Sequence, residues 1–316
     1  DHVALQYLHN SGRLMWFRFK KGLSNIIFHR AEVITVALEV IYNHTHDKAW
    51  NARLDRFKPF PAYGGMVESF TETGVMDGIL LMNLLGTESD LPPQLSEEVL
   101  KAIHLVHSCG PSNAKPCQKY IFPYFAKQQV VKQNIFYDNA IPLTVDIIMR
   151  GLPVPSYIFS QITAMYLNVN SDPLIDPEVG SNGASVTTSN GMVKYLLHNT
   201  KESRVTLIIR MPMTKILEGW QDLLHVLKQL LSELEPIWRG IRFEKVFYCS
   251  HCLLIKDQSP TTTVDPEWFK KYMLRYKYEW RDHVGVTYTG NETFQCRNTE
   301  VPKPLMVPCK FKSCIH

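Results

Sequence analysis

The sequence lacks the short motifs that mark most large enzyme families. It contains no phosphate-binding GxxxxGK[ST] loop, no dinucleotide-binding GxGxxG, no zinc-protease HExxH and no hydrolase GxSxG. No set of Ser, His and Asp residues stands out from the background either. We therefore expect this chain to have no catalytic activity of its own.

Long apolar runs are also missing. The longest candidates, 78–85 and 141–149, are far shorter than the roughly 20 residues that a helix needs to cross a bilayer. The opening DHVALQYLHNSGRLMWF has neither the basic start and apolar core nor the small-residue cleavage site of a secretory signal. It does not begin with Met, so we expect a piece of a longer protein. We further expect no membrane span and a cytoplasmic location.

Cysteine is scarce and the charge is nearly balanced. Seven cysteines in 316 residues are too few, and odd in number, for a disulfide scaffold, so we expect them to be reduced. The 34 basic and 30 acidic residues give a net charge of +4, which does not call for a nucleic-acid partner. The length and the 45% hydrophobic content suffice for two domains or one large one.

Two of the cysteines form the pattern that points most directly to a ligand. Cys249 and Cys252 make a CxxC after an apolar run and could fill two corners of a tetrahedral zinc site. Cys296 and Cys309 could fill the other two and clip the C-terminal segment onto a sheet, although their spacing matches no known zinc knuckle. Two ordinary reduced cysteines at a strand end are the alternative. A thioredoxin-like role is disfavoured because the pair follows a strand instead of preceding a helix.

Two histidines also have a spacing that could hold a metal ion. His104 and His107 are expected three residues apart on one face of a helix. No carboxylate stands at a matching position to complete such a site, and a core or surface histidine is the usual alternative.

The first hundred residues predict short elements. We expect helices over 2–8 and 31–42, with two β-strands and a turn between them. Further helices are predicted over 75–85 and 96–106, the second with Ser96 as its N-cap. The order helix, strand, turn, strand, helix is that of a winged-helix unit.

The rest of the chain predicts a sheet with helices. A cluster of Pro, Gly and Ser between Cys109 and Tyr120 predicts a domain boundary. Beyond it we expect alternating strands, a helix from Pro155, a hairpin turning at Asn-Gly and an amphipathic helix over 217–234, in the order β-α-β-β-β-α-β. The predicted fold class is α+β, with a largely antiparallel sheet in the second part. The predicted domains are a winged-helix-like helical N-terminal subdomain (1–115), an α/β subdomain (116–255) and a C-terminal extension (256–316).

Several segments, taken in order, resemble the COR domain of Roco proteins. They are ALQYLHNSGRLMWF, IIFHRAEVI, KYIFPYF, IIMRGLPVPSYIFSQIT and FEKVFYCSHCLL, and they span roughly residues 3 to 255. Each is unspecific alone, and their order over a long span carries the resemblance. His29-Arg30-Ala31-Glu32 stands where many Roco proteins have a Pro-Gln-Trp-Leu-like run, which favours the fibrous-histiocytoma branch over the leucine-rich repeat kinases.

The resemblance implies a non-catalytic region that follows a Ras-like Roc GTPase domain. Its first subdomain would pack against that GTPase in cis, and its second would mediate homodimerisation. GTP or GDP would bind only to the Roc domain. The region would couple the GTPase to signalling proteins of the cytoplasm, including those of innate immunity.

Two other functions fit parts of the sequence. A winged-helix protein could bind nucleic acid through the basic residues around Trp16 and Phe19, but the helix expected over 31–42 contains Glu32 and Glu39 and no Lys or Arg. We therefore expect no nucleic-acid partner. A zinc-stabilised protein-interaction scaffold is the other alternative, and it depends on the four cysteines named above.

Overall fold

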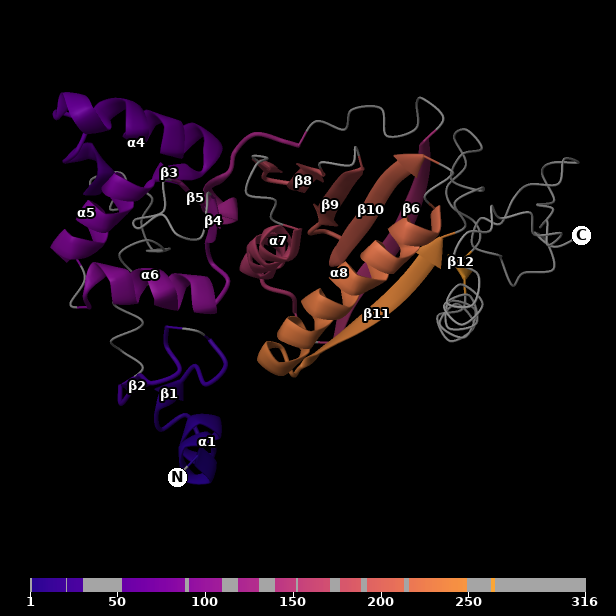
Figure 1. The fold of residues 1–316 in the computed structure, drawn as a ribbon, viewed down its shortest axis with the longest axis horizontal. Helices are drawn as coiled ribbons and strands as arrows, with labels where there is room; N and C mark the ends of the chain where they lie inside the picture. The colour runs from indigo at the N-terminus through magenta and orange to yellow at the C-terminus, as the bar shows by residue number, and fades with distance from the viewer. Residues whose placement is uncertain are drawn as a thin grey trace, which may run out of the picture. The chain divides into compact units, whose positions relative to one another are not determined.

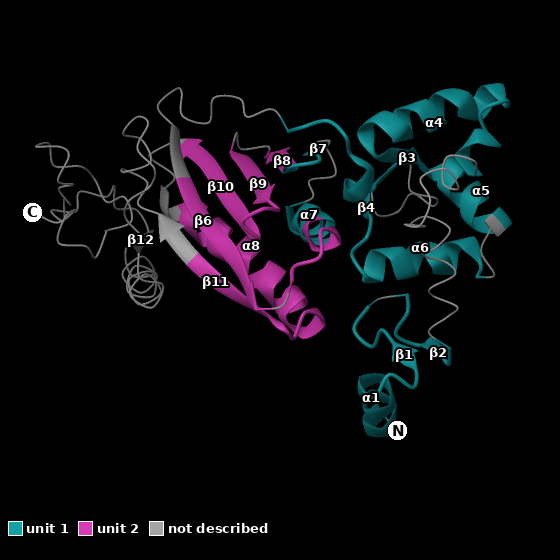
Figure 2. Ribbon diagram, turned by 180° about the vertical axis from the view of Figure 1, so that it is seen from behind, with its two compact units in different colours: residues 1–130, 160–183 teal, residues 131–159, 184–316 magenta. Residues whose placement is uncertain are grey.

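The computed structural model of this chain shows an α+β protein (Figure 1). The residues it describes are 2–20, 22–30, 53–88, 91–109, 119–130, 140–151, 153–170, 177–188, 192–212, 216–248 and 263–264. The chain divides into two compact units, which are 1–130 with 160–183 and 131–159 with 184–316 (Figure 2). The predicted boundary between 115 and 116 falls in 110–118, outside the described residues.

The first unit begins with a helix and a short hairpin. Helix α1 (His2–Asn10) is followed by β1 (Met15–Trp16) and β2 (Ile27–Phe28), which pair antiparallel. The indole of Trp16 donates a hydrogen bond to the Ser24 carbonyl over 2.8 Å, which closes the hairpin loop. The predicted helix and two strands are thus confirmed. The helix expected over 31–42, the last element of the predicted winged-helix order, lies outside the described residues.

The remainder of this unit is helical, with a small antiparallel sheet in the order β3-β5-β4. Its elements are α4 (Pro61–Thr73), β3 (Val75–Asp77), α5 (Gly78–Glu88), α6 (Pro93–Ala102), β4 (His107–Cys109), β5 (Lys119–Ile121) and the 3-10 turn η1 (Pro123–Phe125). Phe70 of α4 and Phe122 next to η1 are fully buried, with ring centroids 5.7 Å apart. These aromatic rings and the buried leucines of α5 form one hydrophobic core.

The helix predicted over 75–85 is confirmed from Gly78 on, where α5 begins, but not over 75–77. These first three residues form β3, and Met76 is fully buried where that strand pairs with β5. The Asp77 side chain then accepts a hydrogen bond from the backbone N–H of Ile79 over 2.8 Å, which caps α5. The strand depends on partners more than 40 residues further along the chain, which local periodicity cannot indicate.

The predicted N-cap and end of the next helix are also wrong. Helix α6 begins at Pro93, where the fixed φ of proline suits a first turn, and Ser96 is fully buried inside the helix. The helix ends at Ala102, because His104 takes a left-handed φ of 58° and the N–H of Leu105 donates to the carbonyl of Leu100 over 3.0 Å.

The second half of the chain forms a seven-stranded sheet in the order β12-β11-β6-β10-β9-β8-β7. Its strands are β6 (Ala140–Gly151), β7 (Glu178–Gly180), β8 (Gly183–Thr187), β9 (Val193–Asn199), β10 (Arg204–Pro212), β11 (Ile241–Tyr248) and β12 (Thr263–Val264). Helix α7 (Tyr157–Asn170) follows β6, and α8 (Ile216–Ile237) follows β10. The predicted order of strands and helices is confirmed, with β7 and β12 as additional short strands. The β10 pairings with β6 and β9 and the β11 pairing with β6 are antiparallel, as predicted.

Helix α8 packs on one face of this sheet. A Cβ atom on Gly219 would overlap the side chain of Met211 and lie 2.9 Å from Leu143, so the helix approaches β10 and β6 closely at this glycine. The covered face is built from alternate residues of both strands. They are Leu143, Val145, Ile147 and Met149 on β6 and Val205, Leu207, Ile209 and Met211 on β10, all of them buried. This is the apolar face that the period-2 pattern predicted.

Within the described parts of the chain, no helix has both the length and the apolar character needed to cross a membrane.

Candidate interaction face of the seven-stranded sheet

The four predicted zinc ligands lie outside the described residues. These are Cys249, Cys252, Cys296 and Cys309. Strand β11 ends at Tyr248, directly before Cys249, so the CxxC follows a strand as expected. Among the residues that the structure describes, no group of three or more His, Cys, Asp or Glu side chains could hold a metal ion.

His104 and His107 do not share a helical face, contrary to the prediction. His104 lies in the left-handed turn that ends α6, whereas His107 belongs to β4. The Nδ1 atom of His107 lies 2.7 Å from the Asn168 side-chain oxygen. Burial lowers the pKa of His107, and the hydrogen bond with Asn168 opposes part of that change. His107 is thus a buried, hydrogen-bonded histidine of the fold.

The face of the sheet opposite α8 is different in character. Helix α8 lies in front of the sheet in Figure 1 and behind it in Figure 2, where no described helix lies over β6 and β10. Strand register places alternate residues of four strands on this side, which we call the polar face. Its members are Thr144, Asp146, Ile148, Arg150, Tyr195, Leu197, Arg204, Thr206, Ile208, Arg210, Arg242 and Glu244.

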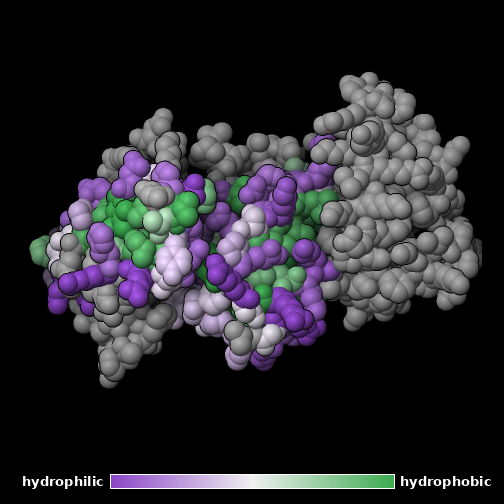
Figure 3. Space-filling view, turned by 90° about the horizontal axis from the view of Figure 1, so that it is seen from below, coloured by the Kyte–Doolittle hydropathy of each residue, from purple (hydrophilic) through white to green (hydrophobic). Residues whose placement is uncertain are grey.

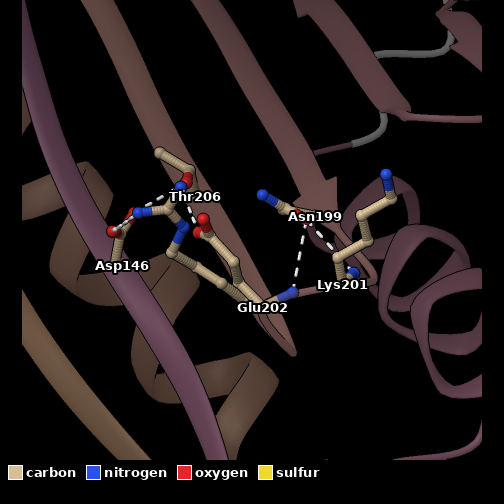
Figure 4. Close-up of polar contacts among 6 residues, drawn as sticks. Asp146, Asn199, Lys201, Glu202 and Thr206 are labelled. Atoms are coloured by element: carbon tan, nitrogen blue, oxygen red, sulfur yellow. Dashed lines mark hydrogen bonds and ion pairs between the residues drawn. The ribbon is translucent and has the colours of Figure 1, made fainter.

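A buried carboxylate lies at the centre of the polar face. Asp146 is only 2% exposed, and its Oδ1 accepts a hydrogen bond from the Thr206 hydroxyl over 2.6 Å (Figure 4). Its Oδ2 accepts a second from Nη1 of Arg204 over 3.3 Å. The other guanidinium nitrogen, Nη2, lies 2.7 Å from Glu202. The carboxylates of Asp146 and Glu202 therefore hold the Arg204 guanidinium in one orientation. The guanidinium in turn compensates the negative charge of Asp146, which would be costly to bury without a partner.

The turn between β9 and β10 keeps Glu202 in place. The Asn199 side-chain oxygen accepts hydrogen bonds from the backbone N–H groups of Lys201, over 3.1 Å, and Glu202, over 3.3 Å. Ser203 has a left-handed φ of 50°, and its carbonyl accepts a hydrogen bond from the Met149 N–H over 2.9 Å. Asparagine is favoured in such turns because its side chain caps nearby N–H groups. This turn was not predicted from the sequence, although Asn199 was a usable signal.

The edge of the polar face carries a more exposed ion pair. Nε of Arg150 lies 3.3 Å from Oε2 of Glu244, with 60% and 55% of the two side chains exposed. Apolar side chains lie among these charges, since Tyr195 and Ile208 are buried and Ile148 is half-buried. Fixed arginine and carboxylate groups around apolar residues suit a protein contact.

Strand β9 contributes two ionisable groups to the covered side of the sheet. Lys194 of β9 is buried, and its Nζ lies 2.5 Å from Oδ2 of Asp222 on α8. His198, further along β9, has its ring centroid 5.3 Å from that of Phe159. Burial lowers the pKa of His198 from 6.5 to about 4, so this imidazole is neutral at pH 7. Both groups help to fix the helices on the sheet.

No protein-family model matches this chain, and no curated protein matches it. A function is therefore proposed below on the geometry of the polar face and on the resemblance in the sequence.

Proposed function

We propose that this chain is the COR region of a Roco protein, a non-catalytic module that dimerises and regulates an upstream Roc GTPase domain. The nucleotide would bind only to that GTPase domain. The partners would be the Roc domain in cis, a second copy of the chain and signalling proteins of the cytoplasm. A nucleic acid is not among the proposed partners.

The observation that carries the proposal is the polar face. An antiparallel sheet with helices on one side commonly turns its other side to water, and such a face is then largely polar. Here the second side instead carries the half-buried apolar residues Ile148 and Leu197 beside a guanidinium held between two carboxylates. Arg150 and Arg204, each held by an acid, place charges of both signs on this face, and such a face can meet its own copy across a two-fold axis with opposite charges in contact.

The N-terminal elements support the proposed packing against a Roc GTPase domain. The helix α1 and the β1-β2 hairpin stand in the order expected for a winged-helix-like COR subdomain. Helix α1 has no buried residue, and Val3 and Tyr7 are 79% and 72% exposed. An apolar helix surface of this kind suits packing against a neighbouring domain. In the proposal, that neighbour is the Roc GTPase domain.

Light scattering of the 316-residue chain tests the proposal. We expect twice the mass of one 36.4 kDa chain for the wild type, and the mass of one chain for Ile148→Asp, which places a charge between Arg204 and Glu244. Ile79→Asp, a change at a 53% exposed position of α5, is the matched control and should remain dimeric. Circular dichroism would confirm that both variants are folded. A wild-type mass of one chain at every concentration tested, or equal dissociation of both variants, would reject dimerisation through the polar face.

A further inference from the structure

Two connections meet at one end of the seven-stranded sheet. The first, 153–156, precedes α7, and the second, 238–240, joins α8 to β11. Ile241 pairs with Gly151 in the sheet, and Gly151 has a φ of +110°. A Cβ atom at Gly151 would lie 2.8 Å from the carbonyl oxygen of Gly240, so the end of β6 and the second connection touch through their backbones.

Large apolar side chains lie beside these connections. The rings of Tyr157 and Trp238 lie with centroids 5.5 Å apart and planes inclined by 50°. Tyr157 is 40% exposed, and Ile237 at the last position of α8 is 48% exposed. Figure 3 shows apolar surface interspersed with hydrophilic residues on the side of the molecule seen from below. Most other large apolar residues that the structure describes in this unit are buried.

Hydrogen bonds and prolines fix the backbone under these side chains. The N–H of Trp238 donates to Leu234 and the carbonyl of Trp238 accepts from Ile241, each over 2.9 Å. On the first connection, the N–H of Ile158 donates to the carbonyl of Pro155 over 3.1 Å. Pro153 and Pro155 restrict the chain further. A partner would therefore meet side chains whose backbone is already ordered, which lowers the entropic cost of binding.

Among the exposed charged residues that follow Ile237 as far as Lys245, basic residues outnumber acidic ones. Arg239 and Arg242 are exposed on the second connection and the start of β11, and Glu235 is the exposed acid in the last turn of α8. Nearby Arg150 is already paired with Glu244. Tryptophan, tyrosine and arginine are the residues most enriched where binding energy concentrates in protein interfaces. The charge favours a partner segment with acidic residues on either side of its apolar part.

We propose that Tyr157, Ile237 and Trp238 form a docking site for a short apolar protein segment flanked by acidic residues. Arg239 and Arg242 would pair with the flanking acids. The site lies at the end of the sheet and does not use the buried pair of the polar face. Arg242 also belongs to the polar face, whereas Tyr157, Ile237, Trp238 and Arg239 do not, so the apolar part of the site is separate from the proposed dimer contact.

A peptide titration tests this site. The probe is a fluorescein-labelled Glu-Glu-Leu-Phe-Leu-Glu-Glu peptide, compared by fluorescence anisotropy with its counterpart in which Lys replaces each Glu. We expect the acidic peptide to bind the full chain at least about tenfold more tightly than the basic one. Ile237→Glu and Arg239→Glu should each weaken binding of the acidic peptide by about tenfold, as expected for residues that carry binding energy.

Ile79→Glu, at a similarly exposed position in the first unit, is the control and should bind like the wild type. Circular dichroism and thermal unfolding would establish that all variants are folded. Equal binding of the two peptides, or the same loss in Ile79→Glu as in Ile237→Glu, would overturn the proposal. So would a failure of the acidic peptide to bind combined with self-association that Ile237→Glu abolishes, since the site would then belong to a second copy of the chain.

Discussion

Asp146 lies in the middle of a strand whose neighbouring positions, Val145 and Ile147, are buried and apolar. Its carboxylate is buried as well, and the Thr206 hydroxyl and the Arg204 guanidinium bind it. The period-2 pattern in the sequence placed Asp146 opposite the apolar face but gave no indication of these partners. They come from β10, about 60 residues further along the chain, and only the register of β6 with β10 brings them together.

Replacing Asp146 with Ala should therefore destabilise the protein. The change leaves Arg204 and the Thr206 hydroxyl without a buried acceptor, and we expect a loss of about 2 kcal/mol in the free energy of unfolding. Glu202→Ala is the matched control, because it removes the other acid on Arg204 from a side chain that is 56% exposed. Its effect should stay within about 0.5 kcal/mol. Urea unfolding measures both free energies. Equal losses in the two variants would show that the buried contact of Asp146 stabilises the protein no more than the exposed contact of Glu202.

His198 should make the stability of the fold depend on pH. Burial holds its pKa at about 4, below the usual 6.5, so the folded protein resists protonation of this ring. The stabilisation is complete above pH 6.5, and it decreases as the pH falls from 6.5 towards 4, because the unfolded chain takes up the proton first. The loss approaches about 3 kcal/mol, since one pKa unit corresponds to about 1.4 kcal/mol.

Urea unfolding at pH 7 and pH 4.5 measures this loss. His198→Leu should make the stability less dependent on pH across that range. His107, whose pKa is also lowered by burial, would supply part of what remains. A variant with the full wild-type dependence would contradict the assignment to His198.

Helix α4 shows how one glycine can determine where an element ends. Gly74 follows the helix with a left-handed φ of 73°, and its N–H donates to the carbonyl of Phe70. A Cβ atom there would lie 2.8 Å from the backbone nitrogen of Ala126 and 2.9 Å from the carbonyl oxygen of Phe122. Both the conformation and the space therefore require glycine at this position.

Two substitutions in this helix should have opposite effects. Gly74→Ala should destabilise the protein by at least about 2 kcal/mol, because a left-handed alanine costs about 1 kcal/mol and the backbone overlap adds to it. Gly65→Ala, inside the same helix with open space around its Cβ position, should stabilise by up to about 1 kcal/mol. Thermal unfolding of the two variants measures both changes. The same sign for both would contradict the account of Gly74.

The helices and strands with a strong period of apolar residues were predicted from the sequence, whereas β3 and α4 were not. The leucine stripe of α8 and the alternation in β6 and β10 reflect long faces that each bury many apolar residues, so the local pattern suffices. Strand β3 has three residues and exists because β5 pairs with it. The preceding helix α4 was missed, and its sequence includes adjacent glycines, which weaken a helical pattern.

For the molecule as a whole, the zinc hypothesis remains a prediction about the C-terminal part of the chain. If Cys249, Cys252, Cys296 and Cys309 form a tetrahedral site, the purified protein should contain about one zinc ion per chain. Cys249→Ser and Cys309→Ser should each lose it. Cys109→Ser, which alters a half-buried cysteine of β4, is the control and should retain it. Atomic emission of the dialysed protein measures the metal, and its absence from the wild type would end the hypothesis.

The sequence by itself determined the α+β class, the order of the long strands and helices in the second half, and which face of that sheet is apolar. These properties depend on the period of apolar residues, which is local information. The tertiary structure decided what the other face contains, where Arg204 binds Asp146, and how Tyr157 comes to lie beside Trp238. Each of these contacts joins residues 58 or more positions apart, and only the register of the strands and the packing of the helices bring such residues within a few ångströms of one another.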